Sequence, residues 1–146
     1  MQKRNSWMIL LLLLAITLQL VGCGVQASSY KKVEPYTLEK NDTGINTVIL
    51  TEKAAERIQI ESAPIATEQI NGDTRLVVPY GALIYDNNGG TWIYTNPEPL
   101  TYIRTAVTVD FIEGDKVYLS EGPDAGTDVA VVAVAELYGT DTGVGK

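Results

Sequence analysis

The sequence predicts an all-β fold with a small α content: a compact antiparallel β-barrel or β-roll with one short helix near its start. Three observations favour this class. Apolar and polar residues alternate along short segments, turn residues recur between these segments, and little of the chain has helical periodicity. The folded domain is expected to span residues 48–145. Because the chain has a single cysteine, its core must hold together without an internal disulfide.

The predicted domain opens with its helix. In residues 48–58, VILTEKAAERI, Thr51 suits the N-cap position, and Glu52 places a negative charge in the first turn, where the helix dipole favours it. Residues 58–70 then alternate, and we expect two extended stretches interrupted near Pro64. Residues 71–73, Asn-Gly-Asp, predict a turn.

From residue 74 onward the sequence reads as a succession of strands. Asn87–Asn88–Gly89–Gly90 supplies residues that tolerate positive φ, as a tight hairpin requires. We expect residues 100–112 to form one long strand and the tail after residue 139 to be loose. The remaining segments assigned to strands are TRLVVP (74–79), GALIYD (81–86), TWIYT (91–95), KVYLSE (116–121) and the closing TDVAVVAVAELYG (127–139).

Residues 1–22 resemble a bacterial lipoprotein signal peptide. A short basic region precedes the apolar run 7–21, which is shorter than the about 20 residues that span a bilayer. The run ends in Leu20–Val21–Gly22–Cys23, which resembles a lipobox. The resemblance implies cleavage after Gly22 and lipid attachment at Cys23, whose acyl chains would anchor the protein to the cell membrane. The alternatives are a non-lipidated signal peptide and a retained anchor in which Cys23 has no role.

Residues 23–47 lack periodicity and are rich in polar residues, so we expect a flexible tether. With the lipid anchor, this tether would hold the domain outside the cytoplasm, on the periplasmic side or the outer face of the membrane. The sequence leaves open which envelope type applies.

The composition argues against several functions. The chain has no histidine, which removes the commonest general base and metal ligand. Its 18 acidic residues exceed its 11 basic residues, and the net charge of −7 disfavours nucleic acid as a partner. No phosphate-binding or metal-binding motif is present. We therefore expect no enzyme activity, no cofactor and no metal.

Three segments resemble the periplasmic adaptor subunits, or membrane fusion proteins, of resistance-nodulation-division efflux systems. LTEKAAERIQIESAPI resembles their short helix followed by a strand, and VVPYGALIYDNNGGTWIYT resembles the start of their C-terminal membrane-proximal domain. RTAVTVDFIEGDKVYLSEGPDAGTDVAVVAVAELYG is similar to their closing strands. The resemblance covers roughly residues 48–145 and implies a barrel of the permuted SH3-like type. The lipoyl domain and the long helical hairpin of complete adaptors are missing, since SAPIATEQINGDTRLVV runs straight through.

The resemblance implies an accessory or adaptor-like role in a transmembrane efflux or transport system. Contact would be made with an inner-membrane transporter subunit, without catalysis. The candidate partner surface comprises Tyr80, Tyr85, Trp92, Tyr94 and Arg104. Trp92 and Tyr94 alternate on one strand and could instead be half-buried cross-strand partners. Arg104 could instead pair with an acid across strands. An alternative function is a free-standing cell-envelope module that binds glycan or peptide on its aromatic side chains.

Overall fold

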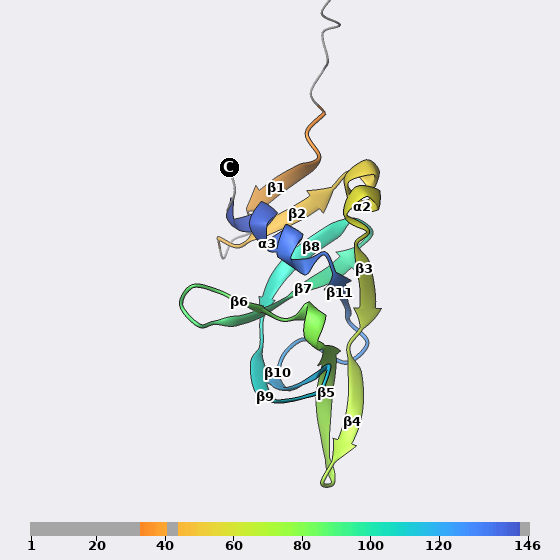
Figure 1. Ribbon diagram of the computed structural model, residues 1–146, viewed down its shortest axis with the longest axis vertical. Helices are drawn as coiled ribbons and strands as arrows, with labels where there is room; N and C mark the ends of the chain where they lie inside the picture. The colour runs from red at the N-terminus through yellow and green to blue at the C-terminus, as the bar shows by residue number, and fades with distance from the viewer. Residues whose placement is uncertain (1–32, 41–43, 144–146) are drawn as a thin grey trace, which may run out of the picture. The chain divides into compact units, whose positions relative to one another are not determined.

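The computed structural model describes residues 33–40 and 44–143, and the folded unit begins at Glu34 (Figure 1). Most described residues lie in two antiparallel sheets, which confirms the all-β class with a small α content. The expected signal peptide, its motif Leu20–Val21–Gly22 and Cys23 lie outside the described residues. None of the helices in the described part has the length and apolar character that crossing a bilayer requires.

The larger sheet has seven strands, in the order β1-β2-β8-β7-β11-β3, with β6 paired to β7. The smaller sheet has four, in the order β4-β5-β10-β9. The strands are β1 (Tyr36–Lys40), β2 (Asn46–Leu50), β3 (Glu61–Pro64), β4 (Ala66–Ile70), β5 (Asp73–Pro79), β6 (Ile84–Tyr85), β7 (Thr91–Glu98), β8 (Thr101–Ala106), β9 (Thr108–Glu113), β10 (Lys116–Glu121) and β11 (Asp128–Val132). The helices are α2 (Glu52–Ile58), the 3₁₀ helix η2 (Tyr80–Ala82) and α3 (Val134–Thr142).

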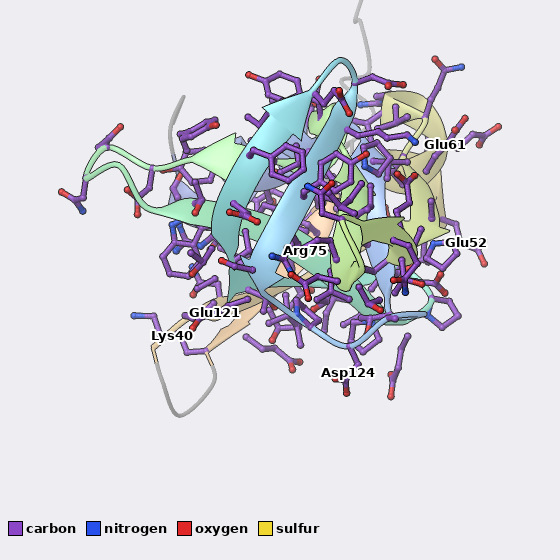
Figure 2. The ribbon with its side chains drawn as sticks, turned by 90° about the horizontal axis from the view of Figure 1, so that it is seen from below. Lys40, Glu52, Glu61, Arg75, Glu121 and Asp124 are labelled. Carbon is purple, nitrogen blue, oxygen red and sulfur yellow. The ribbon has the colours of Figure 1, made fainter. Side chains whose placement is uncertain are left out.

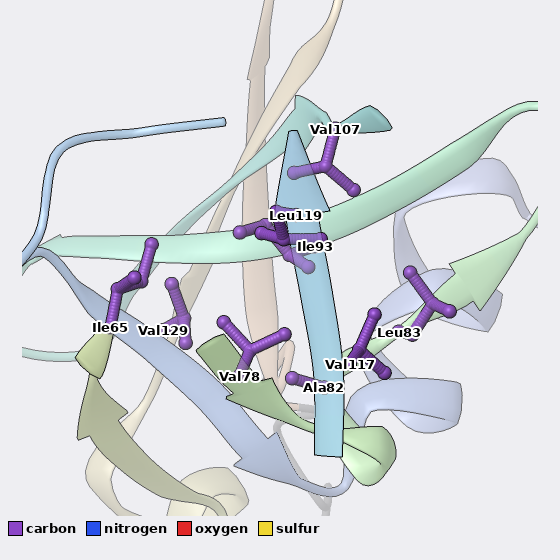
Figure 3. Packing of buried hydrophobic residues seen from close by; sticks show 9 residues of the cluster. All are labelled: Ile65, Val78, Ala82, Leu83, Ile93, Val107, Val117, Leu119 and Val129. Atoms are coloured by element: carbon purple, nitrogen blue, oxygen red, sulfur yellow. The ribbon is translucent and has the colours of Figure 1, made fainter. Parts of the chain in front are cut away.

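Consecutive side chains of a strand point to opposite faces of the sheet. Because the central strands of the larger sheet carry apolar residues in consecutive positions, both of its faces are apolar. On β7, Ile93 belongs to a core between the two sheets, and its neighbour Tyr94 belongs to a core beneath helices α2 and α3. We call these the inter-sheet core (Figure 3) and the helix-side core. The inter-sheet core contains Ile65, Val78, Ala82, Leu83, Ile93, Val107, Val117, Leu119 and Val129. The helix-side core contains Val48, Leu50, Ala55, Tyr94, Tyr102, Ala130, Val134 and Leu137.

Helix α2 forms as the sequence predicts. The hydroxyl of Thr51 accepts a hydrogen bond from the Ala54 N–H at 3.2 Å, so it caps the helix. Glu52 lies in the first turn, and Ala55 is buried in the helix-side core. The helix ends at Gln59, which adopts the left-handed conformation with φ 53°.

The expected long strand over residues 100–112 is divided at Val107. Its first part, β8, belongs to the larger sheet, and its second part, β9, belongs to the smaller one. Val107 is held at the corner by Thr91, whose carbonyl accepts from the Val107 N–H at 3.0 Å and whose hydroxyl donates to the Val107 carbonyl at 2.6 Å. Ile65 makes an equivalent crossing between β3 and β4. Backbone pairing thus forms two sheets joined at two corners, and closure into a barrel stays a prediction.

The expectation that residues 23–47 form a tether is wrong for its last part. Residues 36–40 form β1, which pairs in unbroken register with β2 from Tyr36↔Leu50 to Lys40↔Asn46. The sequence did not predict β1 because the strand is short and mostly polar. Of its five residues, only Tyr36 and Leu38 face the helix-side core. The folded unit therefore begins well before residue 48.

The closing segment also differs from expectation. Strand β11 ends at Val132, and Ala133, with φ 60°, turns the chain into helix α3. Val134 and Leu137 lie one helical turn apart, and both are buried in the helix-side core. The tail, expected to be loose, instead places Asp141 in a buried position with 4% relative exposure.

Candidate partner-contact site

Three side chains from β7, β8 and α3 form a stack at the edge of the helix-side core. Tyr94 pairs with Arg104 across β7 and β8, so Trp92, two residues earlier, lies on the same face of the sheet. The guanidinium carbon of Arg104 lies 4.9 Å from the centre of the Trp92 ring. The same carbon lies 5.7 Å from the ring of Tyr138, which α3 contributes. Both distances are typical of cation–π contacts, and we call this group the Trp92–Arg104–Tyr138 stack.

Asp141 supports the stack from inside the protein. Its Oδ2 accepts the Tyr94 hydroxyl at 2.8 Å and lies 3.0 Å from Arg104 Nε. Its Oδ1 and its main-chain carbonyl accept the side-chain amide of Asn46 at 3.1 and 2.8 Å. The buried carboxylate therefore joins α3 to strands β2, β7 and β8 at once.

The contact of Arg104 with Asp141 is an ion pair without a well-directed hydrogen bond. Nε is buried and close to Oδ2, yet its N–H does not point at an acceptor. The Arg104 side chain keeps 19% relative exposure, against 1% for Asp141. Among the described residues, Arg104 Nε is the buried side-chain nitrogen that has no hydrogen-bond partner.

Asp86 holds Trp92 from the hairpin loop. Its Oδ2 accepts the indole Nε1–H at 2.9 Å, and its Oδ1 accepts the main-chain N–H groups of Asn88 and Gly90, each at 2.8 Å. The Trp92 hydrogen bond, followed by those from Gly90 and Asn88, holds the pKa of Asp86 below its ordinary value. Asp86 is therefore a carboxylate at neutral pH and fixes the indole in one orientation.

Gly90 is required because the Asp86–Trp92 contact passes over its α-carbon. An added Cβ would lie 2.8 Å from Asp86 Oδ2 and 2.9 Å from Trp92 Nε1. Gly89 is needed for a different reason, since its φ of 82° closes the loop. The predicted hairpin thus forms. Gly89 allows the turn, and Gly90 leaves room for the contact between Asp86 and Trp92.

The five residues of the predicted partner surface do not form one surface. Tyr94 is fully buried, so its assignment to a contact surface is wrong and its half-core interpretation is the better one. Burial, then the bond to Asp141, raises the Tyr94 pKa well above its ordinary value. Tyr85 pairs with Thr91 and thus points away from the face that carries Trp92, with 51% exposure. Tyr80 is 50% exposed on η2.

Of the predicted set, the structure brings only Trp92 and Arg104 together at the surface. The predicted partner surface did not include Asn46, Asp86, Tyr138 or Asp141. Asp86, directly before an Asn-Asn-Gly-Gly loop, carried a recognisable signal, since aspartate at that position commonly caps a turn. Asp141 carried no such signal in the sequence, because nothing in a polar tail distinguishes a buried carboxylate from a solvated one.

The stack offers shape, aromatic surface and hydrogen-bond donors. Among the described residues, no group of three or more acidic, histidine or cysteine side chains is arranged to hold a metal ion. Comparison of the chain with protein-family models, with curated proteins and with solved structures found no match.

Proposed function

We propose that the chain is a membrane-anchored lipoprotein that serves a transmembrane efflux or transport system as an accessory, adaptor-like component. It would act by contact with an inner-membrane transporter subunit, and it would catalyse no reaction. The anchor is inferred from the lipobox-like Leu20–Val21–Gly22–Cys23, and the transport context from the three adaptor-like segments.

The observation that best supports contact as the mode of action is the fixed geometry of the Trp92–Arg104–Tyr138 stack. Tryptophan, tyrosine and arginine are the residues that most often dominate binding energy at protein interfaces. Here the indole is held by Asp86 and the guanidinium by Asp141, so little side-chain freedom remains to be lost when a partner binds. Such preorganisation favours a role in recognition.

Photo-crosslinking in native membranes tests the proposal. A photoreactive residue would replace Ala106, which is exposed and pairs with Trp92 on the same face of the sheet. We expect a covalent adduct whose second component is an integral-membrane transport protein, and we expect Trp92→Ala to reduce it. The matched control places the same residue at Asp124, which is exposed in the loop before β11 (Figure 2). Adducts that form equally from both positions, or only with abundant lipoproteins, would contradict transporter contact.

The two remaining parts of the proposal need separate measurements. Metabolic labelling with palmitate should mark the wild-type chain and not Cys23→Ser; equal labelling would remove the anchor. Sedimentation of the full chain with purified peptidoglycan tests the alternative envelope-binding function. Saturable binding that Trp92→Ala abolishes, without any transporter present, would favour that alternative.

A further inference from the structure

Strand β4, like β1, is an edge strand whose pairing is interrupted by no proline and no bulge. Natural edges are blunted by proline, by bulges, by short length or by flanking charge. In this protein β3 ends in Pro64, β6 has two residues, and the pairing of β9 with β10 carries two register shifts. β4 instead pairs with β5 without interruption from Ala66↔Val77 to Ile70↔Asp73, and no described strand lies on its other side.

The turn that joins β4 to β5 determines which backbone groups face outward. Asn71 and Gly72, with φ of 53° and 93°, form a two-residue turn, so the flanking Ile70 and Asp73 exchange hydrogen bonds. Because bonded pairs alternate along an antiparallel ladder, Glu68 also points its backbone groups toward β5. The N–H and C=O of Thr67 and Gln69 therefore point away from the sheet. Both residues are exposed.

The side chains of β4 determine what can pair with that edge. Glu68 lies on the outer face of the sheet, where its Oε1 accepts Lys116 Nζ at 2.5 Å and its Oε2 accepts the Tyr118 hydroxyl at 2.8 Å. A second copy of β4 could use all the outward groups of Thr67 and Gln69 only in the register that places Glu68 opposite Glu68. Like charges directly opposite are destabilising, so the edge disfavours its own copy.

We propose that β4 is a docking edge for an extended segment of a protein partner, which adds as an antiparallel strand with lysine or arginine opposite Glu68. Apolar partner side chains would lie opposite Ala66 and Ile70, which flank Glu68 on the same face. The smaller sheet favours a basic segment, because its carboxylates outnumber its only basic residues, Arg75 and Lys116. The edge lies outside the Trp92–Arg104–Tyr138 stack, and the inference depends neither on that stack nor on the lipid anchor.

The probe is an acetylated peptide, Ser-Ile-Thr-Lys-Thr-Val-Ser, added to the full chain in detergent. Backbone hydrogen exchange measured by NMR should show about tenfold slower exchange at the Thr67 and Gln69 amides in the bound state. The Glu68 amide, already bonded to β5, should change little. A peptide with glutamate in place of lysine should bind about tenfold more weakly. No protection at saturating peptide, or equal binding of the glutamate peptide, would overturn the proposal.

A pair of substitutions isolates the edge itself. Thr67→Pro removes an outward N–H and leaves the β4–β5 bonds in place, whereas the matched Thr67→Val keeps that N–H. We expect binding to fall about tenfold for Thr67→Pro and to be unchanged for Thr67→Val. Peptides N-methylated at both threonines test the same bonds on the unaltered protein and should also bind about tenfold more weakly. Equal binding of the two variants and of the two peptides would overturn the inference, as would dimers of the wild-type chain that form through β4.

Discussion

Replacing Asp141 by asparagine should destabilise the fold while preserving its shape. The substitution keeps the size of the side chain, and the amide oxygen can still accept the Tyr94 hydroxyl. What it removes is the negative charge 3.0 Å from Arg104 Nε. The guanidinium is then left in a largely buried position with only the more distant charge of Asp86 to balance it.

The size of the effect follows from that burial. Removing one partner of a fully buried ion pair costs about 3–5 kcal/mol. The 19% exposure of Arg104 and its contact with two aromatic rings lower this cost, whereas the loss of the charge-assisted bond from Tyr94 adds about 1 kcal/mol. We therefore expect Asp141→Asn to reduce the free energy of unfolding by about 3 kcal/mol.

Urea denaturation of the full chain in detergent, followed by circular dichroism, measures this loss. The control is a double-mutant cycle with Arg104→Met, which removes the charge that Asp141 balances. If our reasoning holds, Asp141→Asn should cost about 1–2 kcal/mol less in the Arg104→Met background than in the wild type. A loss below about 1 kcal/mol in the wild type, or strict additivity in the cycle, would show that the ion pair does not carry the stability.

Three further predictions test other parts of the structure. Tyr94 holds its proton more tightly when folded, so its contribution to stability is complete below the unfolded pKa near 10 and falls as pH rises above it. Between pH 10 and 11 the wild type should lose about 1 kcal/mol more than Tyr94→Phe in urea denaturation, and parallel curves would contradict this. Gly90→Ala should break the hydrogen bond between Asp86 and Trp92, and NMR should then show a shifted, fast-exchanging indole N–H. An unchanged indole signal would mean that the loop backbone shifts to make room for the added Cβ. The hydrogen bonds from Lys116 and Tyr118 lower the Glu68 pKa below 4.5, so their contribution to folding stability is present above pH 4.5 and is lost as pH falls. Glu68→Gln should therefore weaken the fall of the free energy of unfolding at acidic pH. The same fall in both proteins would argue against the Glu68–Lys116 pair.

The parts of the fold that follow local rules could be predicted from the sequence. The cap at Thr51, the turn at Asn71–Gly72 and the hairpin before Trp92 each depend on a few neighbouring residues, and all three form as expected. The crossing at Val107 could not be predicted, because a strand that changes sheets keeps its alternation and differs only in its partners.

The candidate site could be predicted only at its surface. Trp92 and Arg104 were identified because aromatic and basic side chains are common candidates for contact with a partner. Asp141 was missed because its importance comes from burial by α3, and that helix lies where alternation predicted a closing strand. Tyr94 was misassigned for a related reason, since the face it occupies is covered by the same helix.

The bond between Asn46 and Asp141 joins residues 95 positions apart in the chain. A contact of such long range forms late, because the entropy of closing a large loop must be overcome before the bond gains anything. Asp141 also contacts Tyr94 and Arg104, so a local opening of α3 would release the side chains of three strands at once.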